Sequence, residues 1–150
     1  MNGAAQQKLL FPGLSGFYDS FGEIAYALVR VIIGYILFMH GWAKFNGGLD
    51  PVVAGMAKNG LSPAIFFAGS AMFLETVGAI CVAIGLFTRF FAAALAIELA
   101  IALIVVHLPK GFSAAQGGFE YVLLLGIVMF AIAIRGGGPY SVDRMIGKEL

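Results

Sequence analysis

Long apolar stretches alternate along the chain with short polar or glycine-containing segments. Four stretches are long enough to cross a hydrocarbon core as helices, which takes about 20 residues at about 1.5 Å of rise each. Their expected bounds are residues 24–45, 63–86, 88–108 and 119–134. The runs are too continuous for the alternation of a membrane β-barrel. The pattern therefore predicts an all-α integral membrane protein, a four-transmembrane-helix antiparallel bundle in a single membrane domain, residues 1–150.

The flanking segments carry weaker signals. Residues 1–22 include a short apolar run, but Pro12 and Gly13 interrupt it before it reaches the length of a signal-peptide core. We expect residues 1–22 to form an interfacial arm. Residues 135–150 are expected to form a cytoplasmic tail with a short amphipathic segment, for which Ser141 is a suitable helix cap.

Composition agrees with a membrane location. The chain has 150 residues, of which 61% are hydrophobic and 11% charged, whereas a soluble domain carries about 25% charged residues. A net charge of +1 provides no basic field for nucleic acid, so we expect none as a partner. Lysines and arginines of the short loops favour the side of both termini, which predicts cytoplasmic N and C termini.

The single cysteine, Cys81, excludes an intramolecular disulfide and a CxxC redox pair. It lies in an apolar run and is expected to be a small core residue. A redox role would therefore depend on a cofactor or a partner protein.

Three charged residues lie deep in the apolar stretches, where a charge costs roughly 2.5 to 3.5 kcal/mol on insertion scales. They are Arg30, Glu75 and Glu98. Their depths allow Arg30 to pair with either glutamate or with both, so we expect a buried ion-pair or proton-linked cluster. The alternative is a purely structural clasp between helices. Gly34 and Gly41 share the helix stripe of Arg30 and predict close approach of a neighbouring helix.

A second polar group is expected near the opposite helix ends, lining a mouth that binds a ligand. Its members are His40, Lys44, His107, Glu120 and Tyr121. Each has a structural alternative. Lys44 can extend to the headgroups, and Glu120 and Tyr121 can cap the fourth helix. The spacing of the two histidines favours interfacial hydrogen bonding over ligation, so we predict no metal site. No catalytic residue is assigned.

Seven short motifs follow one another in a recognisable order. They are Arg30-x3-Gly34, His40-Gly41-x2-Lys44, Glu75-x2-Gly78, Gly85-Leu86-x-Thr88-Arg89, His107 before Gly111-Phe112, Gly118-x-Glu120-Tyr121 and Gly138-Pro139-Tyr140-Ser141. Over about residues 24–143 this order resembles the DoxX family of small four-helix bacterial membrane proteins. The resemblance implies a bacterial inner (plasma) membrane location and, for some members, association with thiosulfate:quinone oxidoreductase or with membrane-linked oxidoreductase complexes. Glu98 and Cys81 are not motif positions.

The leading hypothesis is a subunit of, or partner to, a quinone-linked oxidoreductase system in sulfur-compound or oxidative-stress metabolism. We expect no covalently bound cofactor. The polar mouth would bind quinone, and a redox protein partner would supply electrons, because the sequence has no haem or flavin motif. Two alternatives stay open. One is a non-enzymatic assembly or scaffolding subunit. The other is a small-solute or ion permease, for which so few helices require a homo-oligomer.

Overall fold

The computed structural model describes residues 9–149, which form helices and turns. After a 3₁₀ turn at Pro12–Leu14, the first helix, α1 (Ser15–Gly47), runs for 33 residues. It begins at Ser15 and not near residue 24, because apolar residues continue to recur at helical spacing towards the N terminus. Much of the expected arm is therefore helical, and residues 1–8 lie outside the described range.

A helix that the sequence analysis missed follows α1 directly. It is α2 (Leu49–Lys58), which starts after Gly48 at a φ of 86°. Pro51 lies in its first turn, where the missing N–H does no harm. Asp50 at its start and Lys58 at its end complement the helix dipole, and these signals could have revealed it.

The second membrane-length run, Ala64–Ile84, changes its winding halfway. It consists of α3 (Ala64–Phe73), a π-helical segment at Leu74–Gly78 and α4 (Ala79–Ile84). Gly85 ends it in the left-handed conformation, as the glycine predicts.

The third run begins at Thr88, three residues after Gly85, and also changes its winding. Helix α5 (Thr88–Ala102) continues into a π-helical segment at Leu103–His107 and a 3₁₀ turn at Leu108–Lys110. A short loop with a 3₁₀ turn at Ala114–Gln116 then leads to α6.

The chain ends with α6 (Glu120–Arg135) and the short α7 (Val142–Ile146). The Ser141 side chain accepts a hydrogen bond from Arg144 N, which confirms the predicted cap of the C-terminal segment.

Three helices are long and apolar enough to cross a membrane: Pro12–Gly47, Ala64–Ile84 and Thr88–Lys110. The fourth candidate, α6, has 16 residues and therefore a length of about 24 Å. This falls below the roughly 30 Å of a hydrocarbon core. An all-helical membrane protein is confirmed, while the count of four spans and the antiparallel bundle stay predictions.

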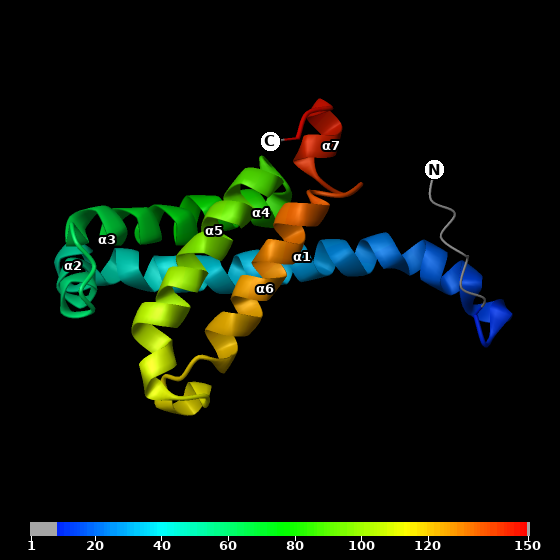
Figure 1. Cartoon of the computed structure of the whole chain (residues 1–150). Helices are drawn as coiled ribbons and strands as arrows, with labels where there is room; N and C mark the ends of the chain where they lie inside the picture. Colours follow the sequence, from blue (N-terminus) through cyan, green and yellow to red (C-terminus); the bar gives the residue numbers. More distant parts are fainter. Residues whose placement is uncertain (1–8, 150) are drawn as a thin grey trace, which may run out of the picture.

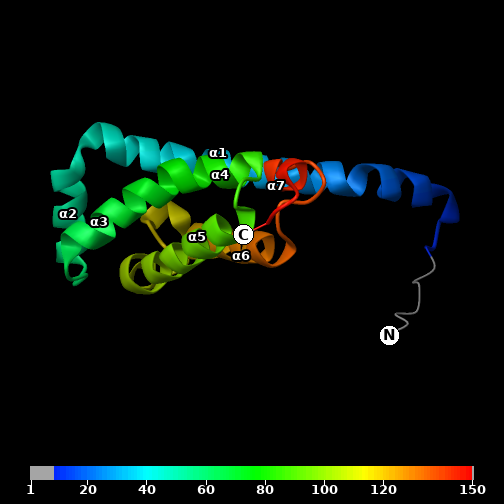
Figure 2. The same ribbon diagram turned by 90° about the horizontal axis from the view of Figure 1, so that it is seen from above.

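The helices form two packed groups (Figures 1 and 2). Helix α1 runs beside α3 and α4, and α5 pairs with α6 in a hairpin that crosses α1 obliquely. Glycines bring α1 against its neighbour. A Cβ on Gly34 would lie 2.8 Å from Ala79 O, and one on Gly41 would lie 2.5 Å from the carbonyl carbon of Glu75. This confirms the close approach expected at Gly34 and Gly41, and it fixes the register of the two helices.

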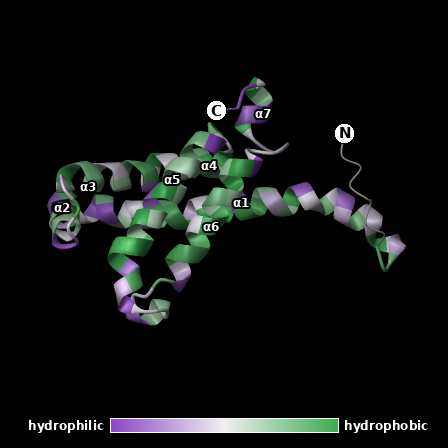
Figure 3. Cartoon of the chain, viewed as in Figure 1, coloured by the Kyte–Doolittle hydropathy of each residue, from purple (hydrophilic) through white to green (hydrophobic). Residues whose placement is uncertain are grey.

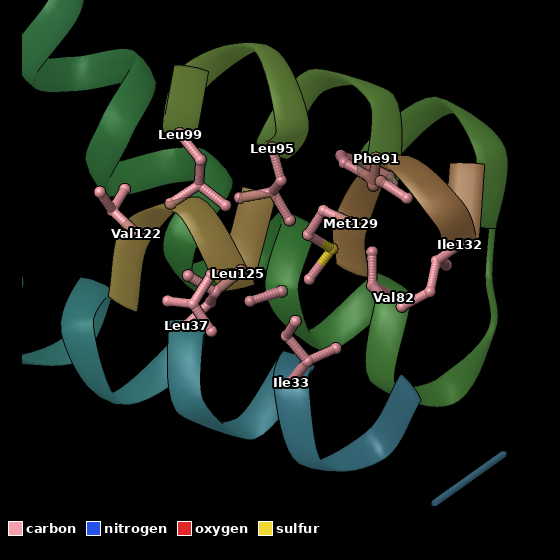
Figure 4. Close-up of a cluster of buried hydrophobic side chains, with 12 residues drawn as sticks. Ile33, Leu37, Val82, Phe91, Leu95, Leu99, Val122, Leu125, Met129 and Ile132 are labelled. Carbon is pink, nitrogen blue, oxygen red and sulfur yellow. The ribbon is translucent and has the colours of Figure 1, made fainter. Parts of the chain in front are cut away.

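Apolar side chains from α1, α4, α5 and α6 meet in one core (Figure 4). Its least exposed large members are Leu37, Val82, Leu95, Met129 and Ile132. Many large apolar side chains on the outer faces are exposed, and hydrophobic residues cover most of α4, α5 and α6 (Figure 3). A helix that is apolar all round suits a lipid environment.

Candidate functional site

A cavity of about 940 Å³ lies between the C-terminal part of α1, the helices α2 and α3, and the end of the α5–α6 hairpin at which the loop joins the two helices. Most of its lining is apolar. The polar side chains that line it are His40, Lys44, Asn59, Ser70, Glu75, Glu98, His107 and Tyr121. We call this site the charged cavity. Its volume lies in the range of small-molecule sites, roughly 300 to 1,000 Å³.

An ion pair between α1 and the π-helical segment is the main charged contact of the cavity. Lys44 Nζ donates a hydrogen bond to Glu75 Oε1. The Glu75 side chain is 9% exposed, and that of Lys44 is 31% exposed. Gly41, one turn before Lys44, packs against the backbone of Glu75, so close helix contact brings the two charges together.

The second carboxyl group of the cavity comes from α5. Glu98 interacts electrostatically with Glu75 and Lys44 and is within hydrogen-bonding reach of Glu75. The Oε2 atoms of both glutamates are buried and have no hydrogen-bond partner among the described residues. Such orphaned groups are rare in folded proteins, because an unmade hydrogen bond of a buried polar atom is costly.

Two π-helical segments lie at the cavity, and each carries one of its ionisable side chains. Glu75 lies in the segment Leu74–Gly78, and His107 ends the segment Leu103–His107. In the first segment the Thr76 hydroxyl donates to Met72 O at 2.5 Å. A π turn changes the direction of the side chains that follow it, and such turns occur frequently at functional sites. The sequence analysis predicted neither segment.

The histidines and Tyr121 belong to the cavity, as the sequence analysis expected of a shared mouth. His107 Nδ1 lies 2.8 Å from Gly117 O, which orients its ring. The rings of His40 and Tyr121 lie 6.4 Å apart between centroids. Glu120 is not among the lining residues. Its Oε1 accepts a hydrogen bond from Ala114 N at 2.6 Å, so it holds the loop that precedes α6.

Arg30 belongs to a separate polar group at the other end of the helices. Its side chain is buried, and Nη2 donates to Tyr140 O at 2.5 Å. The expected pairing of Arg30 with Glu75 or Glu98 is therefore wrong. The physical reason is helix register, because the contacts of Gly34 and Gly41 place Lys44 beside Glu75 and Arg30 beside Gly85.

Asp143 also belongs to this group, and the sequence analysis missed it. Its carboxylate accepts from Phe87 N at 2.7 Å, Thr88 N at 2.9 Å and Thr88 Oγ1 at 2.6 Å. Asp143 thereby caps the N terminus of α5 from α7, and it also interacts with the charge of Arg30. A buried acid within the short α7 was the available signal. We call Arg30, Thr88, Tyr140, Ser141 and Asp143 the C-terminal clasp.

Glycine is required at the centre of the clasp. A Cβ on Gly85 would lie 1.7 Å from Arg30 Nη1 and 2.5 Å from Ser141 Cβ. The backbone of the same residue accepts from Asp143 N at 2.8 Å. Arg30 Nε and Nη1 have no hydrogen-bond partner in the described part of the chain. The clasp thus packs the tail, α1 and the α4–α5 turn around one arginine.

The seven sequence motifs divide between these two regions. Three motifs, around Arg30, Gly85 and Tyr140, meet in the clasp. The other four, around His40, Glu75, His107 and Tyr121, meet at the charged cavity. The two regions therefore explain why the motifs occur together in one chain.

Comparison with known proteins finds the same family that the order of the motifs resembles. A family model described as DoxX matches residues 25–108. An uncharacterized protein of Haemophilus influenzae is 33% identical over 129 residues, which cover 82% of this chain and 91% of the relative. The protein called putative oxidoreductase CatD of Bacillus subtilis is 34% identical over 126 residues, covering 84% and 90%.

A more distant relative is the uncharacterized membrane protein Rv3486 of Mycobacterium tuberculosis, 26% identical over 133 residues, which cover 81% of this chain and 80% of the relative. No solved structure matches the chain. The family match covers more than half of the chain, and it accompanies three membrane-length helices and two motif-built polar regions. The chain is a membrane protein of the DoxX family.

Proposed function

We propose that this protein binds a quinone in the charged cavity and acts as a membrane component of a quinone-linked oxidoreductase system in the bacterial inner membrane. One observation carries the proposal. The Lys44–Glu75 ion pair and two unpartnered carboxyl oxygens adjoin a large, mostly apolar cavity, and the residues lie within membrane-length helices. Ionisable residues at such depth commonly mark ligand or proton paths.

The cavity has the groups that quinone chemistry needs. A quinone is an apolar ring with two carbonyl oxygens, and its reduction takes up protons as well as electrons. The apolar lining suits the ring, and Lys44 and His40 provide donors for the carbonyl oxygens. Glu75 and Glu98 are the candidate groups for proton exchange.

Electrons would come from a redox protein partner, and any oxidoreductase activity would belong to the complex. The name of the Bacillus subtilis relative, putative oxidoreductase CatD, supports a redox association. In this arrangement the chain contributes the binding site and the proton-carrying side chains.

Photolabelling in lipid nanodiscs tests the proposal. Wild-type protein is irradiated with an azido-substituted quinone, and the labelled residues are mapped by mass spectrometry. We expect labels on cavity residues of α2, α3 and α5 that excess unlabelled quinone suppresses. The Lys44→Met variant should lose them.

Glu23→Gln is the matched control, because Glu23 is an exposed acid paired with Arg135 outside the cavity. It should label like the wild type. Labelling that is spread over the lipid-facing residues, or that persists in Lys44→Met, contradicts the proposal and favours the scaffolding alternative.

A further inference from the structure

The charged cavity contains more acidic than basic groups. Lys44 is paired with Glu75, which leaves Glu98 without a counter-ion of its own among the described residues. The other titratable groups that line the cavity are His40 from α1, His107 from the second π-helical segment and Tyr121 from α6. Helices α2 and α3 contribute no charged lining residue. An ionised Glu98 would therefore be an uncompensated charge within a membrane-length helix.

The contact between the two glutamates needs a proton. Glu98 lies within hydrogen-bonding reach of Glu75, yet Oε2 of each is buried without a donor in the part of the chain that the structure describes. Ionised carboxylates only accept hydrogen bonds, so two of them cannot bond to each other. A single proton between the side chains supplies the missing donor, as it does in other carboxyl pairs that share a site.

We infer that Glu98 is a neutral carboxylic acid that donates a hydrogen bond to Glu75 and serves as the proton donor of the charged cavity. Glu75 stays ionised because Lys44 pairs with it. Glu98 was not among the motif positions, so this role belongs to the residues of this chain.

The second half of the inference rests on the proposed quinone site. During proton transfer the O–H bond of Glu98 breaks, and an O–H bond forms on a ligand oxygen that has gained electron density. The carboxylate that this leaves interacts with Lys44, which is the cation that acts on Glu98. Lys44 would thereby stabilise the state after transfer as well as the ion pair before it.

Infrared spectroscopy without added ligand tests the protonation directly. Wild-type protein in nanodiscs at neutral pH should show the C=O stretching band of a protonated carboxyl group in the difference spectrum against Glu98→Gln. The difference against Glu23→Gln should lack this band. An absent band, or one that persists in Glu98→Gln, overturns the inference.

Unfolding measurements provide a second readout. The amide of Glu98→Gln can donate to Glu75 as the acid does, so we expect its unfolding midpoint within about 2 °C of the wild type. If Glu98 were ionised and held a cation instead, sodium or potassium would raise the wild-type midpoint, and Glu98→Gln would remove that dependence. This result also overturns the inference.

The two proposals fail separately. An infrared band without photolabelling of the cavity leaves the neutral acid in place and removes the quinone site. Photolabelling of the wild-type cavity without the infrared band removes the neutral acid alone.

Discussion

The charged cavity and the C-terminal clasp share helices α1 and α5 but use buried polar groups differently. In the clasp, both carboxylate oxygens of Asp143 accept hydrogen bonds from the α4–α5 turn, and Asp143 is not among the residues that line the charged cavity. In the cavity, Glu75 and Glu98 each keep an oxygen without a partner among residues 9–149, beside open volume. Polar groups that protein atoms satisfy hold a fold together, whereas groups that the protein leaves partly unsatisfied are available to a ligand or a proton.

Arg30 differs from Asp143, because the hydrogen bonds of its side chain are only partly satisfied. Two of its nitrogens have no partner among the described residues. Its guanidinium nevertheless packs against Gly85 and Ser141 and interacts with Asp143, so dense packing surrounds it. The contrast between the regions therefore concerns both hydrogen bonding and open space.

The largest effect is expected from Asp143→Ala. This change leaves Phe87 N, Thr88 N and Thr88 Oγ1 without their acceptor, and it removes the charge that acts on Arg30. We expect a loss of about 3 kcal/mol or more in the free energy of unfolding, measured in mixed micelles. Asp19→Ala, at an exposed site of α1, is the control and should stay within about 0.5 kcal/mol. Equal stability of the two variants would break the comparison.

Lys44→Met should have the next largest effect, a loss of about 2 kcal/mol. It leaves Glu75 without its counter-ion, but the partial exposure of Lys44 limits the cost. The double variant Lys44→Met with Glu75→Gln should recover most of this stability without recovering quinone labelling. If the double variant is as unstable as the single one, the ion pair is architectural and the two regions do not differ as described.

Gly41→Ala should cost about 1 to 2 kcal/mol, because its Cβ would overlap the backbone of Glu75 and push the helices apart. Gly22→Ala is a matched control in the same helix, where an added Cβ meets nothing within 4 Å. It should be neutral or stabilising by up to about 1 kcal/mol. Unfolding curves of the two variants give the difference. A neutral Gly41→Ala would show that the register of α1 is not fixed there.

His40→Ala should have the smallest effect on stability, within about 0.5 kcal/mol, because the side chain is exposed on α1. Its loss should weaken quinone binding about fivefold, the equivalent of one hydrogen bond of about 1 kcal/mol. Competition photolabelling measures this change. Unchanged binding would confine the ligand site to the buried part of the cavity around Glu75.

Local signals predicted much of the helical structure, and particular residues explain the failures. The cap at Ser141 behaved as expected, because cap chemistry depends on neighbouring residues. Helix α2 was missed although its capping charges were visible. The π-helical segments have no comparable local signal, since tertiary packing supports their wider turns. Asp143 was missed because its partners lie more than 50 residues away along the chain.

The sequence alone determined the membrane character of the chain, three of the four membrane-length helices that its hydropathy predicts and the small-residue contacts of α1, because hydropathy and side-chain size are properties of each residue and its neighbours. It also named His40, Lys44, Glu75, Glu98 and His107 as the residues to examine. Only the tertiary structure decided which charges meet. Gly34 and Gly41 set a register that joins Lys44 to Glu75 and sends Arg30 to the tail. Such partners depend on where separate helices touch, which no local pattern specifies.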